Sequence, residues 1–156
     1  MANFIVKKAT KVHIEKVINL RISLLKEVRA ITCLEDEEML ITATREYIED
    51  AFHNDTFISY IAIAGEEIVG ASGIVLFKRP PYPGNLKGLE AYILNIYTSP
   101  LYRQQGIANE LLQQCMSECK QRDVKRIWLH ATEEGSPIYA KVGFKKKGNE
   151  MEYFFS

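Results

Sequence analysis

Ile96-Tyr97-Thr98-Ser99-Pro100-Leu101-Tyr102-Arg103-Gln104-Gln105-Gly106-Ile107-Ala108 is the stretch that decides the fold. It ends an apolar strand over residues 90–98, stops at Ser99-Pro100, and enters an amphipathic helix over 106–122. A glycine lets the main chain approach a bulky anion, and a helix start offers unpaired N–H groups and a favourable dipole. The spacing suits a pyrophosphate, although on its own it also fits ordinary turn chemistry.

Two common nucleotide-binding patterns do not occur in this stretch. The lysine and hydroxyl of GxxxxGK[ST] are missing, and so is the glycine spacing of GxGxxG. The sequence therefore disfavours both a P-loop and a dinucleotide-binding fold.

Hydrophobic periodicity outside this stretch predicts a mixed α/β chain. Helical and strand-like apolar patterns alternate along it, separated by turn residues. The predicted order is a strand at 4–9, helices at 11–28 and 35–52, strands at 56–64 and 68–78, a loop at 79–85, a strand at 90–98, a helix at 106–122, a strand at 126–131, a short helix at 136–141, and a final β region from 144 that includes residues 153–155. Gly70 and Gly73 indicate a bulge, a close backbone approach, or small residues on a packed face.

The length and the charge of the chain limit its domain organisation and the classes of partner that are expected. The 156 residues predict a single domain over 1–156. Twenty Lys and Arg balance twenty Asp and Glu, so neither nucleic acid nor a membrane surface is an expected partner. No long apolar run or signal-like start occurs, which predicts a cytoplasmic protein. Cysteine and histidine spacing fits no metal site, so no metal is expected.

A second segment, Ile138-Tyr139-Ala140-Lys141-Val142-Gly143-Phe144, follows the apolar strand Ile127-Trp128-Leu129-His130. Together with 96–108 it resembles the GNAT N-acetyltransferase superfamily. The first segment is similar to the R/Q-x-x-G-x-G/A coenzyme A motif of that family, and the second to its tyrosine helix that ends in Gly-Phe. The predicted order of elements is also the GNAT order, so the resemblance covers nearly the whole chain.

The resemblance implies a GNAT acyl-CoA N-acyltransferase fold, with a central, mostly antiparallel sheet flanked by helices. It also implies acetyl-CoA as acyl donor. Main-chain groups of one strand end would pair with the pantetheine arm, and amides of the helix start would hold the pyrophosphate. The first set is Ile96, Tyr97 and Thr98, and the second is Arg103, Gln104, Gln105, Gly106, Ile107, Ala108 and Asn109.

The resemblance places Tyr139 near the coenzyme sulfur. Its phenol could protonate the leaving thiolate, and a packed helix aromatic is the alternative. Glu90, at the start of the central strand, is the candidate base because of its position. The alternative is that Glu90 is a solvated surface group. A water chain could remove the proton instead of Glu90. Glu133, Glu134 and His130 are weaker candidates, and His130, in an apolar strand, suits a hydrogen-bonded core histidine better.

The implied function is direct transfer of acetyl to a primary amine of a small molecule or peptide. A noncatalytic acyl-CoA-binding sensor module is the alternative. The acceptor is not identified, and its candidate contacts are Tyr82, Tyr92, Tyr153 and the acidic run 35–38. The aromatic residues 153–155 suggest a homodimer, or a strand that buries them within one subunit.

Overall fold

The computed structural model describes residues 3–155, except for the side chain of Asn95. Its six-stranded sheet has the order β1-β3-β4-β5-β6, and β2 also pairs with β4. The strands are β1 (Ile5–Lys8), β2 (Phe57–Ile58), β3 (Tyr60–Ala64), β4 (Glu67–Lys78), β5 (Leu89–Thr98) and β6 (Arg126–Trp128). Neighbouring strands are antiparallel except β5 and β6, which are parallel. The predicted mixed, mostly antiparallel sheet is confirmed.

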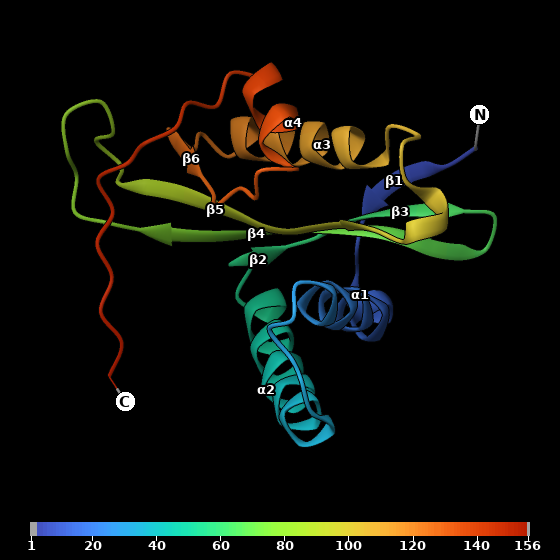
Figure 1. Cartoon of the computed structure of the whole chain (residues 1–156). Helices are drawn as coiled ribbons and strands as arrows, with labels where there is room; N and C mark the ends of the chain where they lie inside the picture. Colours follow the sequence, from blue (N-terminus) through green and yellow to red (C-terminus); the bar gives the residue numbers. More distant parts are fainter. Residues whose placement is uncertain (1–2, 156) are drawn as a thin grey trace.

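Helices cover both faces of this sheet (Figure 1). One face carries α1 (Ile14–Glu27) and α2 (Leu34–His53), and the other carries α3 (Ile107–Gln121) and α4 (Ser136–Lys141). Short 3₁₀ turns, η1 (Lys11–His13) and η2 (Pro100–Tyr102), precede α1 and α3. Apolar side chains fill both interfaces, with Ile18 and Ile48 buried under the sheet on one side and Leu112 and Cys115 on the other. Each helix pair therefore has its own core.

The two glycines of β4 are explained by close approaches. A Cβ on Gly70 would lie 3.0 Å from Cγ2 of Ile107, and one on Gly73 would lie 2.9 Å from the Phe57 ring. The pairing of β4 with β5 also shifts register between Ala71 and Gly73. Gly70 thus lets the first turn of α3 rest directly on β4, which sets where that helix begins.

The predicted final β region is wrong, because residues 144–155 form no strand. Tyr153, Phe154 and Phe155 are 80%, 82% and 91% exposed. β-propensity is effective only where a partner strand and a packed face receive the side chains. The chain after α4 instead crosses the end of the sheet in an extended form and finishes on the side of α1 and α2 (Figure 1).

Candidate functional site

The centre of the site is the end of β5, where the strand leaves both neighbours. Leu94 pairs with Gly73 and Tyr97 with Ala71, so β5 has one more residue than β4 between these pairs. This is a β-bulge, which turns the strand. On the other edge, β6 pairs with β5 only at residues 90–92 among the residues described. The edge of β5 beyond Tyr92 is therefore available for a ligand's amide groups.

The start of α3 lies directly after this open edge. Gln104 and Gly106 have φ values of +64° and +87°, and Gly106 is the N-cap without a side-chain cap. The first N–H groups of a helix have no intrahelical acceptor. Among the residues described, and apart from its own chain neighbours and the adjoining backbone, nothing lies within 4 Å of where a Cβ of Gly106 would be. Unpaired donors thus face an open space that suits an anion.

Arg103 stabilises the loop between β5 and α3. Its Nε donates to the carbonyl of Thr98 at 2.9 Å, and its Nη2 reaches both carboxylate oxygens of Glu27 in α1 at 3.0 Å. The guanidinium also lies 5.3 Å from the centre of the Tyr97 ring. The Arg103 side chain is therefore engaged with the protein, and its main-chain N–H donates to the carbonyl of Pro100 at 3.4 Å, so its predicted contact with a phosphate has no free donor in this arrangement.

Thr98 carries a polar atom that needs a partner. Its Oγ1 is buried and makes no hydrogen bond within residues 3–155. Buried hydroxyl groups are usually paired, since an unpaired one costs about 1–3 kcal/mol. This atom sits at the end of the open strand edge, so the residues present fit a bound ligand with hydrogen-bonding groups, as the pantetheine arm has.

Tyr139 lies in α4, half-buried, with its ring edge against Phe144 at 5.9 Å between centres. Burial raises the pKa of its phenol, and nearby Cys115 and Tyr92 add to the rise. The group therefore keeps its proton, as a proton donor must before it acts. Gly143, with φ +108°, ends this helix as predicted.

Two thiols are unsuited to nucleophilic catalysis. Cys115 and Cys119 are fully buried in the core under α3. Burial raises the pKa of Cys115 to about 12 and that of Cys119 to about 11. A thiolate is the reactive form of cysteine, so these residues are structural.

Glu90 is completely buried, and its carboxylate accepts hydrogen bonds from four residues. Tyr82 donates to it at 2.6 Å, Arg126 at 3.0 Å, Arg79 at 3.1 Å and the Trp128 indole at 3.1 Å. Burial would raise the pKa of this carboxyl, but the donors together hold it below its ordinary value. A carboxylate so stabilised is a weak base. The contacts favour a role in joining β5, β6 and the loop before β5 over the predicted role as base.

His130 is not a core histidine, contrary to the sequence interpretation. β6 ends at Trp128, and the His130 side chain is 56% exposed. Its Nδ1 lies 2.6 Å from the Tyr92 hydroxyl, and its Nε2 lies 2.7 Å from a carboxylate oxygen of Glu150. The predicted pocket residue Tyr92 is therefore one end of a three-residue chain of hydrogen bonds.

The sequence did not reveal this hydrogen-bonded chain of side chains, because Tyr92 and His130 are 38 residues apart and His130 and Glu150 are 20 residues apart. One signal was available. Residues 90 and 92 share a face of β5, and the parallel pairing aligns them with 126 and 128 of β6. Continuing that alternation puts residue 130 on the same side, but Glu150 comes from a segment without regular structure.

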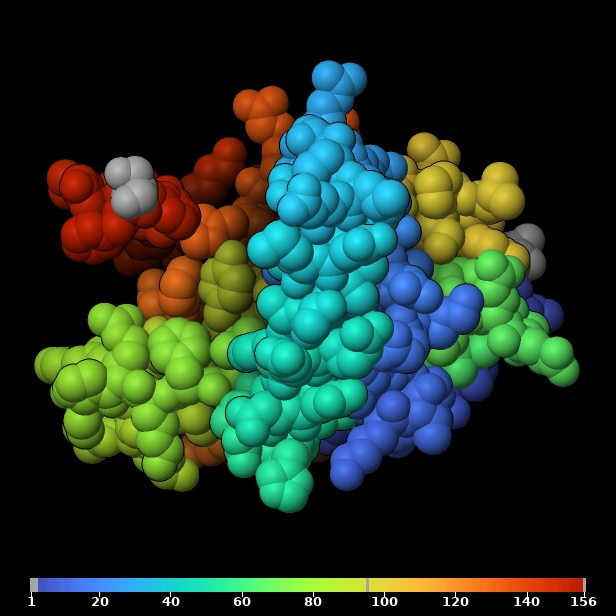
Figure 2. Space-filling model, turned by 90° about the horizontal axis from the view of Figure 1, so that it is seen from below, coloured from blue at the N-terminus to red at the C-terminus, as the bar shows by residue number. Residues whose placement is uncertain are grey.

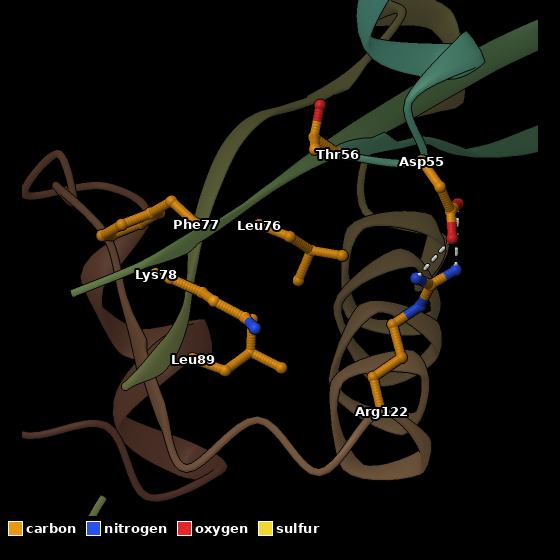
Figure 3. A pocket seen from close by; sticks show the side chains of 7 residues that line it. All are labelled: Asp55, Thr56, Leu76, Phe77, Lys78, Leu89 and Arg122. Atoms are coloured by element: carbon orange, nitrogen blue, oxygen red, sulfur yellow. Dashed lines mark hydrogen bonds and ion pairs between the residues drawn. The ribbon is translucent and has the colours of Figure 1, made fainter. Parts of the chain in front are cut away.

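A hollow bordered partly by Arg122 lies away from this site. It has a volume of about 540 Å³ and is bordered by β4, β5 and the C-terminal end of α3 (Figure 3). Arg122 points across it to Asp55, donating at 2.8 and 3.2 Å. The wall is otherwise apolar except for Thr56 and Lys78. This hollow is at the far end of α3 from Gly106, so it does not contribute to the anion site.

Among residues 3–155, no three His, Cys, Asp or Glu side chains are grouped as a metal site. No helix in the same range is long and apolar enough to cross a membrane.

Comparisons with known proteins agree with this geometry. The model of the acetyltransferase (GNAT) family matches residues 25–144. A sequence comparison with curated proteins finds no significant match. The fold is similar to a predicted acetyltransferase from Clostridium acetobutylicum solved with acetyl-CoA, at 27% identity and TM-score 0.88, covering 97% of this chain and 96% of that one.

Two other solved structures show the same fold. A GCN5-related N-acetyltransferase from Ralstonia eutropha JMP134 has 23% identity and TM-score 0.86, covering 98% of this chain and 99% of that one. Glucosamine-6-phosphate N-acetyltransferase from Arabidopsis thaliana has 18% identity and TM-score 0.70, covering 99% of each. Because the family model covers most of the sequence, this chain belongs to the acetyltransferase (GNAT) family.

Proposed function

We propose that this protein transfers acetyl from acetyl-CoA to a primary amine of a small molecule or peptide, directly and without a covalent enzyme intermediate. One observation carries the proposal: an open strand edge at 96–98 leads into an unpaired helix start at Gly106. The orphaned Oγ1 of Thr98 supports it. Main-chain groups of 96–98 would pair with pantetheine, and the amides of 103–109 would hold the pyrophosphate.

Tyr139 is the proposed acid. Its half-buried, protonated phenol is suited to give a proton to the departing thiolate. The developing oxyanion of the thioester would accept a hydrogen bond from a main-chain N–H near the bulge of β5. Glu90 as base stays a prediction, and its four donors support a positioning role instead.

The proposal also concerns which residues contact the acceptor amine. Tyr92 is half-buried and His130 is exposed, and the charge of Arg21 in α1 acts on the Tyr92 phenol. Tyr82 donates to Glu90, and Tyr153 is exposed in the C-terminal segment, so neither supports an acceptor contact as well as Tyr92 does. The cytoplasmic location and the homodimer stay predictions, and light scattering tests the second.

Calorimetric titration of the purified protein with acetyl-CoA and with CoA tests the cofactor site. We expect micromolar binding that Gly106→Glu weakens by about 30-fold or more. Two phosphate charges about 4 Å from a carboxylate would each repel it by about 1 kcal/mol even in water. Gly106→Ala is the matched control, because it carries the strain of a positive φ without the charge.

Turnover separates the enzyme from the sensor alternative. The free thiol released from acetyl-CoA is measured with spermidine, L-lysine, kanamycin and a peptide with a free N-terminus. Binding with turnover supports the proposal. Tight binding without transfer to any of these amines favours the noncatalytic sensor, and no binding at all overturns both.

A further inference from the structure

We infer that Tyr92, His130 and Glu150 form a proton relay that takes a proton from the acceptor ammonium group and delivers it to solvent. The inference rests on the proposed acetyl transfer and adds the group that activates its amine. It assigns the role of base to residues other than Glu90.

The hydrogen bonds of the relay are consistent with one placement of the hydrogen atoms. The Tyr92 hydroxyl lies 2.6 Å from Nδ1 of His130, and Nε2 lies 2.7 Å from the Glu150 carboxylate. A carboxylate only accepts, so Nε2 carries the hydrogen, which leaves Nδ1 of the neutral imidazole to accept from the phenol. The Tyr92 oxygen then has a lone pair for a further donor, such as a substrate ammonium group.

The inner end of the relay lies beside the predicted reaction centre. Tyr92 precedes the bulge of β5 by two residues, about 7 Å along a strand. It is also the last residue of β5 that pairs with β6, so it stands where the two strands part. The inner end of the relay therefore lies where the edge of β5 becomes open to a ligand.

The outer end of the relay reaches water. The side chains of His130 and Glu150 are 56% and 61% exposed. Seen from the face that carries α1 and α2, the C-terminal segment lies at the outer edge of the molecule (Figure 2). A proton that arrives on His130 can therefore leave to solvent without crossing the core.

Packing holds the phenol and the imidazole together. The Trp128 ring stands edge-on to Tyr92 at 4.7 Å and to His130 at 5.9 Å between ring centres. The Tyr92 and His130 rings are 5.5 Å apart. These contacts restrict both rings, so the short hydrogen bond does not depend on a flexible surface histidine.

Charged and titratable groups face the relay from several elements. Burial raises the pKa of the Tyr92 phenol and a main-chain hydrogen bond of His130 opposes the rise. Glu150 of the C-terminal segment also raises it, whereas Arg21 of α1 lowers it. Tyr47 of α2 interacts with Arg21, and Tyr139 approaches from α4. Tyr92 therefore stays neutral and passes protons rather than holding a charge.

The proton balance is complete without another reactant. The acceptor R–NH₃⁺ gives one proton to the Tyr92 oxygen as the Tyr92 proton moves to Nδ1 of His130. The imidazolium is stabilised by Glu150 until it releases a proton to water. The neutral amine attacks the thioester carbonyl carbon, and the C–S bond breaks. Tyr139 protonates the thiolate and recovers a proton from the new amide nitrogen.

Kinetics of four variants test the relay with the best acceptor among the four amines named above. We expect His130→Gln and Tyr92→Phe to lower kcat/KM by about 100-fold or more, the usual contribution of general base catalysis. Glu150→Gln should lower it less and shift the rising limb of the pH profile. Glu152→Gln, another carboxylate of the same segment, is the matched control and should change neither. Acetyl-CoA affinity should be unchanged in all four.

Chemical rescue separates a proton carrier from a merely structural residue. Added imidazole should restore turnover of His130→Gly, more strongly at higher pH, where imidazole is neutral. If His130→Gln keeps wild-type kcat/KM and pH profile while the wild type acetylates amines, the relay is wrong and the proposed function stands. If the wild type neither binds acetyl-CoA nor transfers acetyl, the proposed function itself fails.

A measurement that needs no acceptor gives an independent result. In ¹⁵N-histidine NMR spectra of the protein with acetyl-CoA at pH 8, His130 should show hydrogen on Nε2 and an accepting Nδ1. Tyr92→Phe should shift the Nδ1 resonance, and Glu152→Gln should not. Hydrogen on Nδ1 in the wild type would overturn the relay, because that nitrogen could not accept the phenol proton.

Discussion

Acid should weaken this fold through one buried carboxylate of α3, Glu118. It is 8% exposed and accepts from the Tyr60 hydroxyl at 2.6 Å and from Arg122 Nε at 2.7 Å, with Lys8 Nζ at 3.2 Å. Burial alone would raise its pKa, but these donors hold the pKa at about 2. Glu118 thereby joins the helix that begins the anion site to β1 and β3.

The pH dependence has a defined sign. The folded pKa is below the ordinary value of 4.5, so the stabilisation is present above that value and is lost as pH falls toward the folded pKa. A difference from 4.5 to about 2, at about 1.4 kcal/mol per pH unit, corresponds to about 3 kcal/mol. Of this, about 2 kcal/mol should disappear between pH 6 and pH 3.

Urea denaturation of the wild type and Glu118→Gln at pH 6, 4.5 and 3 measures this contribution. The wild type should lose about 2 kcal/mol more unfolding free energy than the variant over that range, with similar m values. Glu46→Gln, on the exposed surface of α2, is the control and should follow the wild type. Equal pH dependence in Glu118→Gln and the wild type would refute the reasoning.

Two further substitutions test individual roles. Cys33→Ala should keep kcat within about twofold, because Cys33 is exposed and its sulfur accepts only from the N–H of Asp36 at 3.5 Å; lost turnover with intact acetyl-CoA binding would instead indicate a covalent intermediate. Glu90→Gln should lower the unfolding free energy by about 1–3 kcal/mol, since it leaves two arginines with a neutral partner. A fall in kcat of about 100-fold with unchanged thermal stability would restore Glu90 as the base.

The backbone conformation of the proposed cofactor site was predictable because it is local in sequence. The strand end, the Ser99-Pro100 stop, Gly106 and the helix start lie within one short stretch, and each has a steric or hydrogen-bonding reason for its conformation. Gly70 could not be interpreted from its own strand. Gly70 lies against Ile107, which is distant in sequence, so the reason for a glycine at position 70 is evident only from the packing of α3 on β4.

The errors of sequence interpretation have a common physical origin. Phe154 and its neighbours have strand-like character, but no strand of the described chain pairs with them. His130 follows three apolar residues, yet β6 ends before it and the side chain is outside the core. For Glu90 the alternative of a solvated surface group is wrong, because the residue is buried with its long-range donors Arg126 and Trp128, whereas its role as base stays a prediction. Each outcome depends on partners far away in the chain.

The two halves of the site therefore respond differently to substitution. The proposed cofactor half would use main-chain groups of 96–98 and 103–109, whose positions depend on backbone conformation and on a small residue at 70. Most side-chain changes there would leave the donors in place. The proposed acceptor half would use side chains from β5, the segment after β6 and the C-terminal segment, such as Tyr92, His130 and Glu150. Replacing one of them changes the chemistry presented to the amine without disturbing the helix start, so acceptor choice can change while acetyl-CoA binding is retained.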